Sequence, residues 1–250
     1  MIKVGVCGAL GKMGQEVCRA VNNASDMELT AKIDIAGGDG IYTSLEKAVS
    51  ACNIDVIIDF TKPDVIFNNA KFCLNNGIKT VIGTTGLNDS QIEELHQLSC
   101  EKKTGCMIVP NFSTGAVLMM MFAQQAAKYF DNAEIIELHH NQKKDAPSGT
   151  AIKTAKMMSE AKATFMKGNC AETETITGAR GGTSYSDIKI HSVRMPGYIA
   201  SQEVIFGSSG QIFKIRHDSM DRTCYMDGVL RAVRHIEQAN DFIYGLEKIL

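Results

Sequence analysis

Two adjacent histidines and a lysine stand before a run of small and polar residues in the middle of the chain. His139, His140 and Lys143 precede the sequence D-A-P-S-G-T, which spans Asp145–Thr150. A histidine or a lysine can donate a proton to a carbon or nitrogen centre that is being reduced. Lys143 also carries a positive charge that attracts anions. The pattern therefore indicates acid–base chemistry on an anionic substrate.

The same stretch ends a predicted strand and begins a predicted helix. Ser148 can cap that helix, and Gly149 and Thr150 would present open backbone N–H groups to a substrate carboxylate. His139 and His140 should face opposite sides of the strand, so we expect no shared metal ion. The alternative is that the histidines are packed or solvated and Lys143 is an ordinary surface lysine.

A glycine-rich loop follows the first predicted strand. Its spacing is G-x-x-G-x-x-G, and the residues that would line a dinucleotide are Gly8, Ala9, Leu10, Gly11, Lys12 and Met13. Small residues let the backbone approach a pyrophosphate at a helix N-terminus. Asp34 ends the second predicted strand and can accept hydrogen bonds from ribose hydroxyls. The alternative is a loop that only caps a helix, with Asp34 as a turn residue.

Two later strand ends should lie at the same edge of the sheet. Ligands bind beyond the carboxyl ends of parallel strands. The residues expected to line the cofactor there are Gly83, Thr84, Thr85, Val109, Pro110, Asn111 and Phe112. Ile35 follows Asp34, so no arginine stands next in line for a 2′-phosphate, although Lys12 or Lys32 could serve. We expect NADH or NADPH, with NADH favoured.

Strands and helices alternate through the first part of the chain, which predicts a parallel sheet. Strands are predicted at 3–7, 28–34, 56–60, 80–83 and 106–109, and helices at 12–22, 45–51, 63–75 and 89–101. The second part combines helices at 116–129, 149–165 and 225–239 with strands at 134–140, 187–195, 202–206 and 211–216. Residues 207–210 read as a hairpin turn, and 167–183 as a loop.

Composition narrows the classes of function. The net charge is −2, so no broad positive field would hold nucleic acid. No apolar run approaches the roughly 20 residues of a membrane-spanning helix, and the N-terminus does not read as a signal peptide. The eight cysteines lack C-x-x-C spacing, which indicates reduced thiols without metal or disulfide. We expect a cytoplasmic protein.

The motifs together resemble the dihydrodipicolinate reductase family. The resemblance rests on the histidine pair, Lys143 and the D-A-P-S-G-T stretch, and it extends to the glycine loop, the G-T-T-G turn at Gly83–Gly86 and P-N-F-S at Pro110–Ser113. A late stretch from His217 to Arg222 resembles the family's H-x-x-x-x-R segment.

This resemblance implies reduction of 4-hydroxy-tetrahydrodipicolinate to tetrahydrodipicolinate in diaminopimelate and lysine biosynthesis. His139 and Lys143 would then be catalytic, and the substrate contacts would be His140, Ser148, Gly149, Thr150, Thr85 and Arg222. The implied fold is a Rossmann-type dinucleotide-binding domain (1–111 and 221–250) and an α+β substrate-binding and oligomerisation domain with a mixed open sheet (112–220). The implied assembly is a homotetramer.

Some positions depart from the pattern of many members. The sequence Ala200-Ser201-Gln202 stands where many have G-E-H, and Gly115-Ala116-Val117 where many have G-V-N. Two other functions remain open at this point. One is another two-domain dehydrogenase, acting on an amino acid or imine, and the other is a non-enzymatic dinucleotide sensor.

Overall fold

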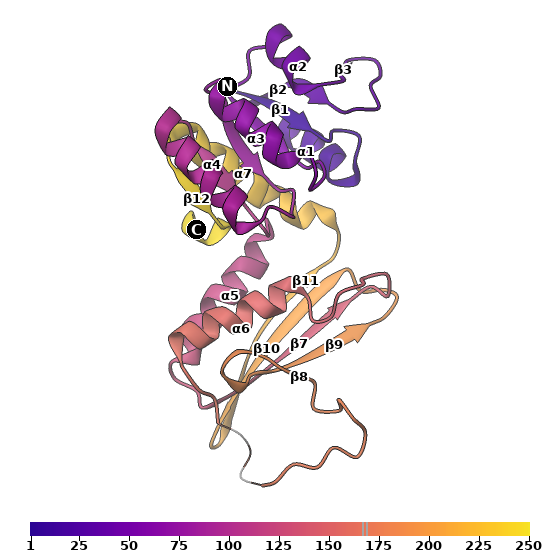
Figure 1. The fold of residues 1–250 in the computed structure, drawn as a ribbon. Helices are drawn as coiled ribbons and strands as arrows, with labels where there is room; N and C mark the ends of the chain where they lie inside the picture. The colour runs from indigo at the N-terminus through magenta and orange to yellow at the C-terminus, as the bar shows by residue number, and fades with distance from the viewer. Residues whose placement is uncertain (167, 169) are drawn as a thin grey trace. The chain divides into compact units, whose positions relative to one another are not determined.

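The chain divides into two compact units, each built around one sheet (Figure 1). The computed structural model describes residues 1–166, 168 and 170–250. Unit 1 comprises Met1–Thr114 and Arg222–Leu250, and unit 2 comprises Gly115–Asp221. Lys167 and Asn169, both in the predicted loop at 167–183, lie outside the described residues.

Unit 1 contains a seven-stranded sheet in the order β12-β6-β5-β4-β1-β2-β3. Every neighbouring pair in this sheet is parallel. The strands are β1 (Ile2–Cys7), β2 (Met27–Ile33), β3 (Ile41–Tyr42), β4 (Val56–Asp59), β5 (Lys79–Ile82), β6 (Cys106–Ile108) and β12 (Phe242–Tyr244). All four residues of β4 are buried, as expected where helices cover both faces of a parallel sheet. The predicted Rossmann-type fold is confirmed.

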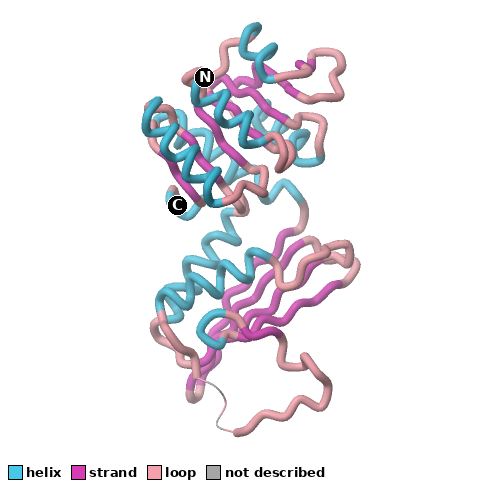
Figure 2. Tube along the Cα trace, viewed as in Figure 1, coloured by secondary structure: helices cyan, strands magenta, loops and turns pink. Residues whose placement is uncertain are grey.

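The helices of unit 1 pack on both faces of its sheet (Figures 1 and 2). They are α1 (Lys12–Asn23), α2 (Leu45–Ala51), α3 (Ile66–Asn75), α4 (Asp89–Lys102) and α7 (Met226–Gln238), with short 3₁₀ turns η2 (Arg222–Tyr225) and η3 (Leu246–Lys248). Helix α1 contacts α7, and α3 contacts α4. Both connections from β1 to α1 and from β4 to α3 leave the sheet at its carboxyl edge, where a ligand can bind.

Unit 2 contains a five-stranded mixed sheet in the order β11-β10-β7-β9-β8. Its strands are β7 (Asn132–His139), β8 (Gly182–Thr183), β9 (Lys189–Arg194), β10 (Ala200–Ser208) and β11 (Gln211–Ser219), with a 3₁₀ turn η1 (Tyr185–Asp187). The β7–β9 pair is parallel, and the other pairs are antiparallel. The predicted mixed sheet is confirmed.

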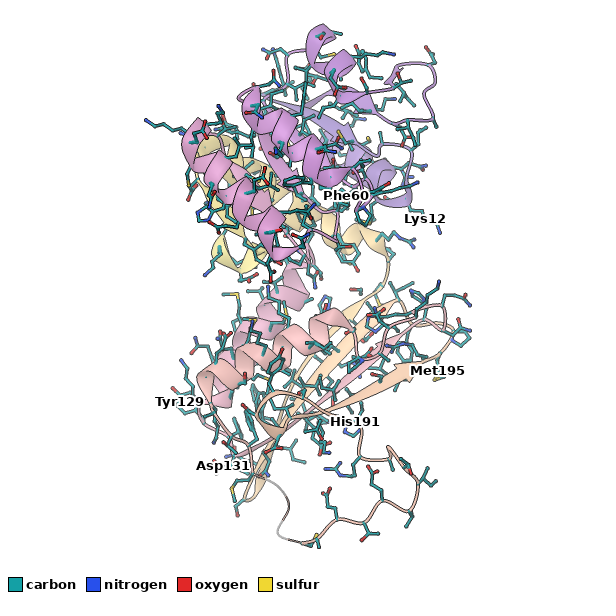
Figure 3. The ribbon with its side chains drawn as sticks, viewed as in Figure 1. Lys12, Phe60, Tyr129, Asp131, His191 and Met195 are labelled. Atoms are coloured by element: carbon teal, nitrogen blue, oxygen red, sulfur yellow. The ribbon has the colours of Figure 1, made fainter. Side chains whose placement is uncertain are left out.

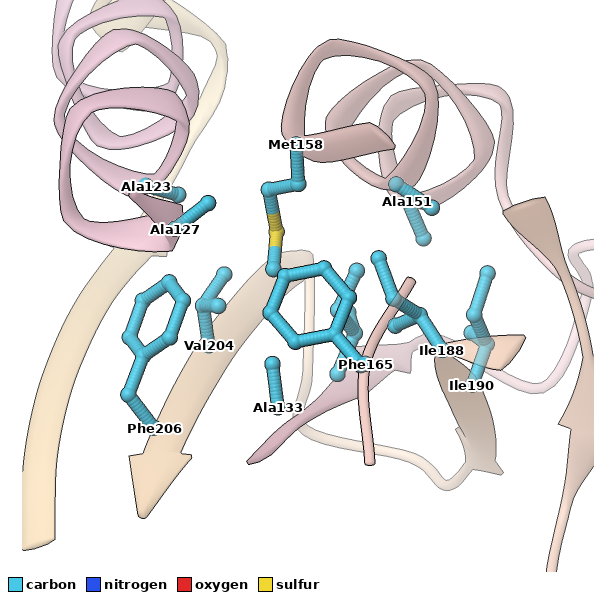
Figure 4. Packing of buried hydrophobic residues seen from close by; sticks show 12 residues of the cluster. Ala123, Ala127, Ala133, Ala151, Met158, Phe165, Ile188, Ile190, Val204 and Phe206 are labelled. Carbon is cyan, nitrogen blue, oxygen red and sulfur yellow. The ribbon is translucent and has the colours of Figure 1, made fainter. Parts of the chain in front are cut away.

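Helices α5 (Thr114–Ala127) and α6 (Gly149–Ala161) pack against the unit 2 sheet. Alanines on both helices allow close approach, and Met158 of α6 points toward Phe165 in the cluster shown in Figure 4. Val204 and Phe206 face the same cluster from β10 and are fully buried. This core fixes β7 relative to the start of α6. The histidine–lysine segment, His139–Lys143, lies in the chain between the end of β7 and α6.

Several predicted boundaries were wrong. Helix α3 begins at Ile66 rather than Pro63, because residues 63–65 form a turn. Helix α6 ends at Ala161, before Lys162 turns to bond the Phe130 carbonyl. Strands β3, β8 and β12 have two or three residues each and were not predicted, and β8 lies within the predicted loop. So short a strand has no readable alternation and depends on its neighbour in the sheet.

Candidate active site

The glycine loop of unit 1 has the backbone that close approach to a phosphate requires. Gly8 has φ +76°, and a side chain there would meet the Phe60 carbonyl. A side chain at Gly14 would meet the backbone of Gly8 and Ala9. Gly11 caps α1 without a side-chain hydrogen bond, so no side chain competes for the first N–H groups of the helix. These features fit a dinucleotide pyrophosphate.

Asp34 ties the glycine loop to the end of β2. Its carboxylate accepts hydrogen bonds from the backbone N–H of Leu10 at 3.1 Å and of Ala36 at 3.1 Å. The side chain is half-buried beside the loop. It therefore stands where the family of dinucleotide folds places the ribose-binding acid.

Two cavities open at the carboxyl edge of the unit 1 sheet. The larger, about 580 Å³, is lined by Gly8, Gly11 and Asp34 among others, together with Glu46, Lys62 and Asp64. The smaller, about 330 Å³, is lined by Gly11, Lys12, Met13, Phe60, Thr61, Pro63, Gly83, Thr84 and Thr85. Figure 3 labels Lys12 and Phe60 at this edge. The glycine loop and the G-T-T-G turn are therefore brought together, as the sequence predicted they would be.

A buried carboxylate that sequence reasoning missed supports both cavities. Asp59 ends β4 with no exposure to solvent. It accepts hydrogen bonds from Thr61 N (2.9 Å) and Oγ1 (2.6 Å), Asn69 Nδ2 (2.8 Å) and Thr84 Oγ1 (2.8 Å). These four hydrogen bonds compensate for burying the polar side chain. Asp59 thereby fixes the two loops that carry Thr61 and Thr84.

The segment Val109–Phe112 contributes differently from the other predicted cofactor residues. Val109 and Phe112 are buried, and Phe112 packs against Phe60 with ring centroids 5.5 Å apart. Pro110 is exposed, and Asn111 accepts a hydrogen bond from Ser113 N. None of the four lines either of the two cavities. Within the glycine loop, Ala9 is buried and Leu10 is exposed.

In unit 2, β7 delivers His139 to the start of the histidine–lysine segment. The His139 side chain is 14% exposed, and its Nδ1 lies 2.5 Å from Glu137 Oε2. His140 is exposed, and its Nδ1 accepts a hydrogen bond from Gln142 N. The two imidazoles thus have different surroundings, as their opposite sides of the strand imply.

Lys143 is held in place by Asp145 within the same loop. Its Nζ donates to both carboxylate oxygens, at 2.7 and 2.8 Å. This pairing lowers the pKa of Asp145. An anionic ligand that approached Lys143 would compete with Asp145 for these donors.

The N-terminus of α6 follows directly. Ser148 is buried and caps the helix by accepting from Ala151 N at 3.2 Å. Gly149 is exposed with open space around its Cα, and Thr150 is half-exposed. The predicted cap therefore exists, and it leaves the first turn accessible to an anion.

Glu137 links these parts, and sequence reasoning did not single it out. It is fully buried, and its carboxylate accepts from His139, from Arg194 Nη1 (2.8 Å) and Nη2 (2.7 Å), and from Ser148 N (3.2 Å). Burial would raise its pKa, but the bonds from Arg194, Ser192 and His139 together lower it. Its only sequence signal is its place two residues before His139, on the same side of the strand.

The remaining predicted substrate contacts, Thr85 and Arg222, belong to unit 1 and are exposed. Gln202 is packed inside unit 2, at the position where the motif of many family members has histidine. Gln202 is 4% exposed, and its Nε2 donates to Thr154 Oγ1 at 2.8 Å. It therefore braces the first turns of α6.

Among the residues that the structure describes, no group of three or more His, Cys, Asp or Glu side chains could hold a metal ion. None of the helices described is both long and apolar enough to cross a membrane.

Comparisons with known proteins agree across both units. Residues 2–112 match the family model described as dihydrodipicolinate reductase, N-terminus, and residues 115–250 match the one described as dihydrodipicolinate reductase, C-terminus. A 4-hydroxy-tetrahydrodipicolinate reductase from Gloeothece citriformis is 49% identical over 100% of this chain and 98% of its own length. A 4-hydroxy-tetrahydrodipicolinate reductase from Syntrophomonas wolfei is 48% identical over 99% of this chain and 98% of its own length.

Solved structures extend the comparison to the fold. A dipicolinate-bound dihydrodipicolinate reductase from a Paenisporosarcina species aligns with a TM-score of 0.93 at 43% identity, covering 100% of both chains. A probable dehydrogenase from Thermotoga maritima aligns with a TM-score of 0.67 at 12% identity, over 98% of this chain and 92% of its own. The second likeness shows the fold alone. The family models and full-length relatives show that this chain belongs to the dihydrodipicolinate reductase family.

Proposed function

We propose that the chain reduces 4-hydroxy-tetrahydrodipicolinate to tetrahydrodipicolinate with NADH or NADPH, in diaminopimelate and lysine biosynthesis. The observation that carries this proposal is the grouping of His139, Lys143 and the capped N-terminus of α6 on one unit, in a chain whose other unit has a dinucleotide loop. Family membership makes the dehydrogenase of another class and the cofactor sensor the weaker hypotheses.

Unit 2 would bind the dicarboxylate. The N-terminus of α6 at Gly149 and Thr150 and the ammonium of Lys143 are suited to carboxylate oxygens, with His140 beside them. Thr85 and Arg222 of unit 1 complete the proposed substrate contacts. His139 or Lys143 would donate the proton that balances the reduction.

Unit 1 would bind the cofactor. The proposed contacts are Gly8–Met13, Asp34, Gly83–Thr85 and Val109–Phe112. A bound nicotinamide supplies the hydride. The larger cavity is lined by the carboxylates of Asp34, Glu46 and Asp64 and by one ammonium, Lys62. This excess of negative charge disfavours a 2′-phosphate, so we propose a preference for NADH.

We further propose a cytoplasmic homotetramer, assembled through unit 2. Size-exclusion chromatography with light scattering would measure the assembly directly.

The activity is tested with the condensation product of pyruvate and aspartate semialdehyde as substrate. We expect the nicotinamide absorbance of NADH to disappear only when this product is present. NADH oxidation with an amino acid or simple imine instead would favour the other dehydrogenase class. Binding of NADH without any oxidation would favour a sensor.

A further inference from the structure

The hydrogen bonds around Glu137 decide which nitrogen of His139 carries a proton. Arg194 donates to both oxygens of Glu137, at 2.8 and 2.7 Å, which favours the ionised carboxylate. An ionised carboxylate only accepts hydrogen bonds, so His139 Nδ1 must donate to Glu137 Oε2 across their 2.5 Å contact. The other ring nitrogen, Nε2, is then the one that exchanges a proton with a ligand.

Arg194 fixes the carboxylate in turn. Its Nη1 and Nη2 donate to the two oxygens of Glu137 at 2.8 and 2.7 Å, a geometry that lysine cannot reproduce. Nη2 also donates to the Asp145 carbonyl at 2.8 Å, and Asp145 holds Lys143. One guanidinium therefore connects the histidine to the loop that carries the lysine.

Ser148 joins the same network from the helix side. Its backbone N–H donates to Glu137 Oε1 at 3.2 Å while its hydroxyl caps α6. The imidazole and the N-terminus of α6 thus contact one buried carboxylate, and the ammonium is linked to it through Asp145 and Arg194.

We infer that Glu137, clamped by Arg194, is the positioning residue of the reductase, setting the tautomer of His139 and supporting its protonated form. This inference rests on the proposed function of His139 as proton donor. The arrangement follows the logic of a histidine oriented by a buried acid in hydrolase triads. Glu137 itself touches neither substrate nor cofactor in this role.

The charged groups around His139 change its pKa in opposite directions. Burial lowers the pKa of His139, Glu137 raises it, and Lys143 and Arg194 lower it. Replacing Glu137 by glutamine removes the contribution that raises the pKa and keeps a side chain of the same shape. The His139 pKa should fall further, and less of the imidazolium needed for proton donation should be present at neutral pH.

The chain contains its own matched control on the opposite side of β7. Glu134 binds Arg180 through both oxygens, at 2.6 and 3.3 Å, and His191 Nε2 at 2.7 Å. Figure 3 labels His191 in unit 2. This cluster has the same three residue types, but Glu134 is 36% exposed where Glu137 is 0% exposed, and it lies on the side of the strand away from His139.

The test compares Glu137→Gln and Glu134→Gln in the full-length protein. The imidazole nitrogens are followed by ¹⁵N NMR, with the His139 signals assigned by their loss in His139→Gln, and kcat is measured against pH. We expect Glu137→Gln to lower the His139 pKa by about one unit. It should move the basic limb of the kcat profile to lower pH by the same amount and reduce kcat about tenfold or more at pH 8, with a smaller change in KM. Glu134→Gln should leave both unchanged.

Unaltered His139 titration in Glu137→Gln, or an equal change in Glu134→Gln, would overturn the inference. The unmodified protein provides a second test that needs no folded variant. Its neutral His139 should be protonated at Nδ1, and protonation at Nε2 instead would also overturn the inference. If the unmodified protein does not oxidise NADH, the proposed function fails, whereas the tautomer measurement still reports on Glu137.

Discussion

At the scale of single residues, the same side-chain types act differently according to what surrounds them. His139 is enclosed and bonded to a buried carboxylate, whereas its neighbour His140 is exposed. Lys143 is held by two bonds to Asp145, whereas Lys144 is an exposed neighbour. These contrasts distinguish the residues suited to proton transfer, His139 and Lys143, from neighbours that only have the same side-chain type.

The first residue-scale prediction concerns the two proposed proton donors. His139→Gln and Lys143→Ala should each reduce kcat by about 100-fold or more, because the arriving hydride is no longer balanced by a positioned proton. The Kd for NADH should stay within about twofold, since the cofactor cavities belong to unit 1. Steady-state kinetics and fluorescence titration measure the two quantities. Lys144→Ala is the control, and equal losses in all three variants would refute the assignment.

Asp34 is expected to influence the choice between NADH and NADPH. Asp34→Asn keeps a hydrogen-bond acceptor for Leu10 N but removes the charge that repels a 2′-phosphate. The ratio of kcat/KM for NADPH to that for NADH should rise about tenfold, which corresponds to about 1.4 kcal/mol. Asp39→Asn, an exposed acid in the same loop that lines neither cavity, is the control. A ratio that does not change in Asp34→Asn would remove the argument for NADH preference.

At the scale of elements, loops and helix ends are placed by strands that were readable from the sequence. The glycine loop lies between β1 and α1, and the G-T-T-G turn follows β5, because both strands end at one edge of a parallel sheet. The tolerance of these junctions, meaning whether the backbone can accept an added side-chain atom, can be measured.

Gly14 tests that tolerance. In an ordinary helix, replacing glycine by alanine stabilises by about 1 kcal/mol. At Gly14 the new methyl group would lie against the Gly8 carbonyl and 2.9 Å from Ala9 Cα, both backbone atoms of the glycine loop. We expect Gly14→Ala instead to cost about 1–3 kcal/mol of unfolding free energy and to weaken NADH binding at least about tenfold.

Urea denaturation and cofactor titration measure the two effects in Gly14→Ala. Gly182→Ala, where no heavy atom lies within 4 Å of the added methyl group, provides the comparison. A Gly14→Ala protein that is more stable than the original and binds NADH normally would show that the loop yields.

Elements and motifs differ in how far sequence alone could predict them. The buried strands β1 and β4, the capped helix α6 and the glycine loop carry local signals, and all were predicted near their observed positions. Asp59 and Glu137 could not be found in this way. Their importance comes from partners distant in sequence, such as Arg194, which lies 57 residues from Glu137. A carboxylate in a strand is read as exposed until its partners are known.

At the scale of the whole molecule, the pH dependence of stability sums over groups whose pKa changes on folding. Burial lowers the pKa of both His139 and His217 below the unfolded value of about 6.5. Paired carboxylates contribute at lower pH: Asp218, bonded to Arg216, has its pKa lowered to about 2. The two kinds of group therefore act in separate windows of pH.

The direction of each contribution depends on whether the folded or the unfolded chain binds protons more readily. For the histidines, the unfolded chain binds protons more readily than the folded one, so their contribution is fully present above about pH 6.5 and is lost as pH falls. The carboxylates contribute above their unfolded pKa of about 4 and lose that contribution in more acidic solution. We therefore expect the free energy of unfolding to fall between pH 7 and pH 5, before the carboxylates titrate, and to fall again below about pH 4.

His217 isolates the first window. Its ring packs against Gly115 at the start of α5, so a proton there must be accommodated in a half-buried site of unit 2. A titrating group changes stability by at most about 1.4 kcal/mol per pH unit, so removing one should visibly flatten the curve. Urea denaturation at pH 7, 6 and 5 should give a smaller slope for His217→Gln than for the original chain. His235→Gln, at an exposed histidine of α7, should keep the original slope. Equal slopes in all three proteins would mean that burial of His217 does not oppose its protonation.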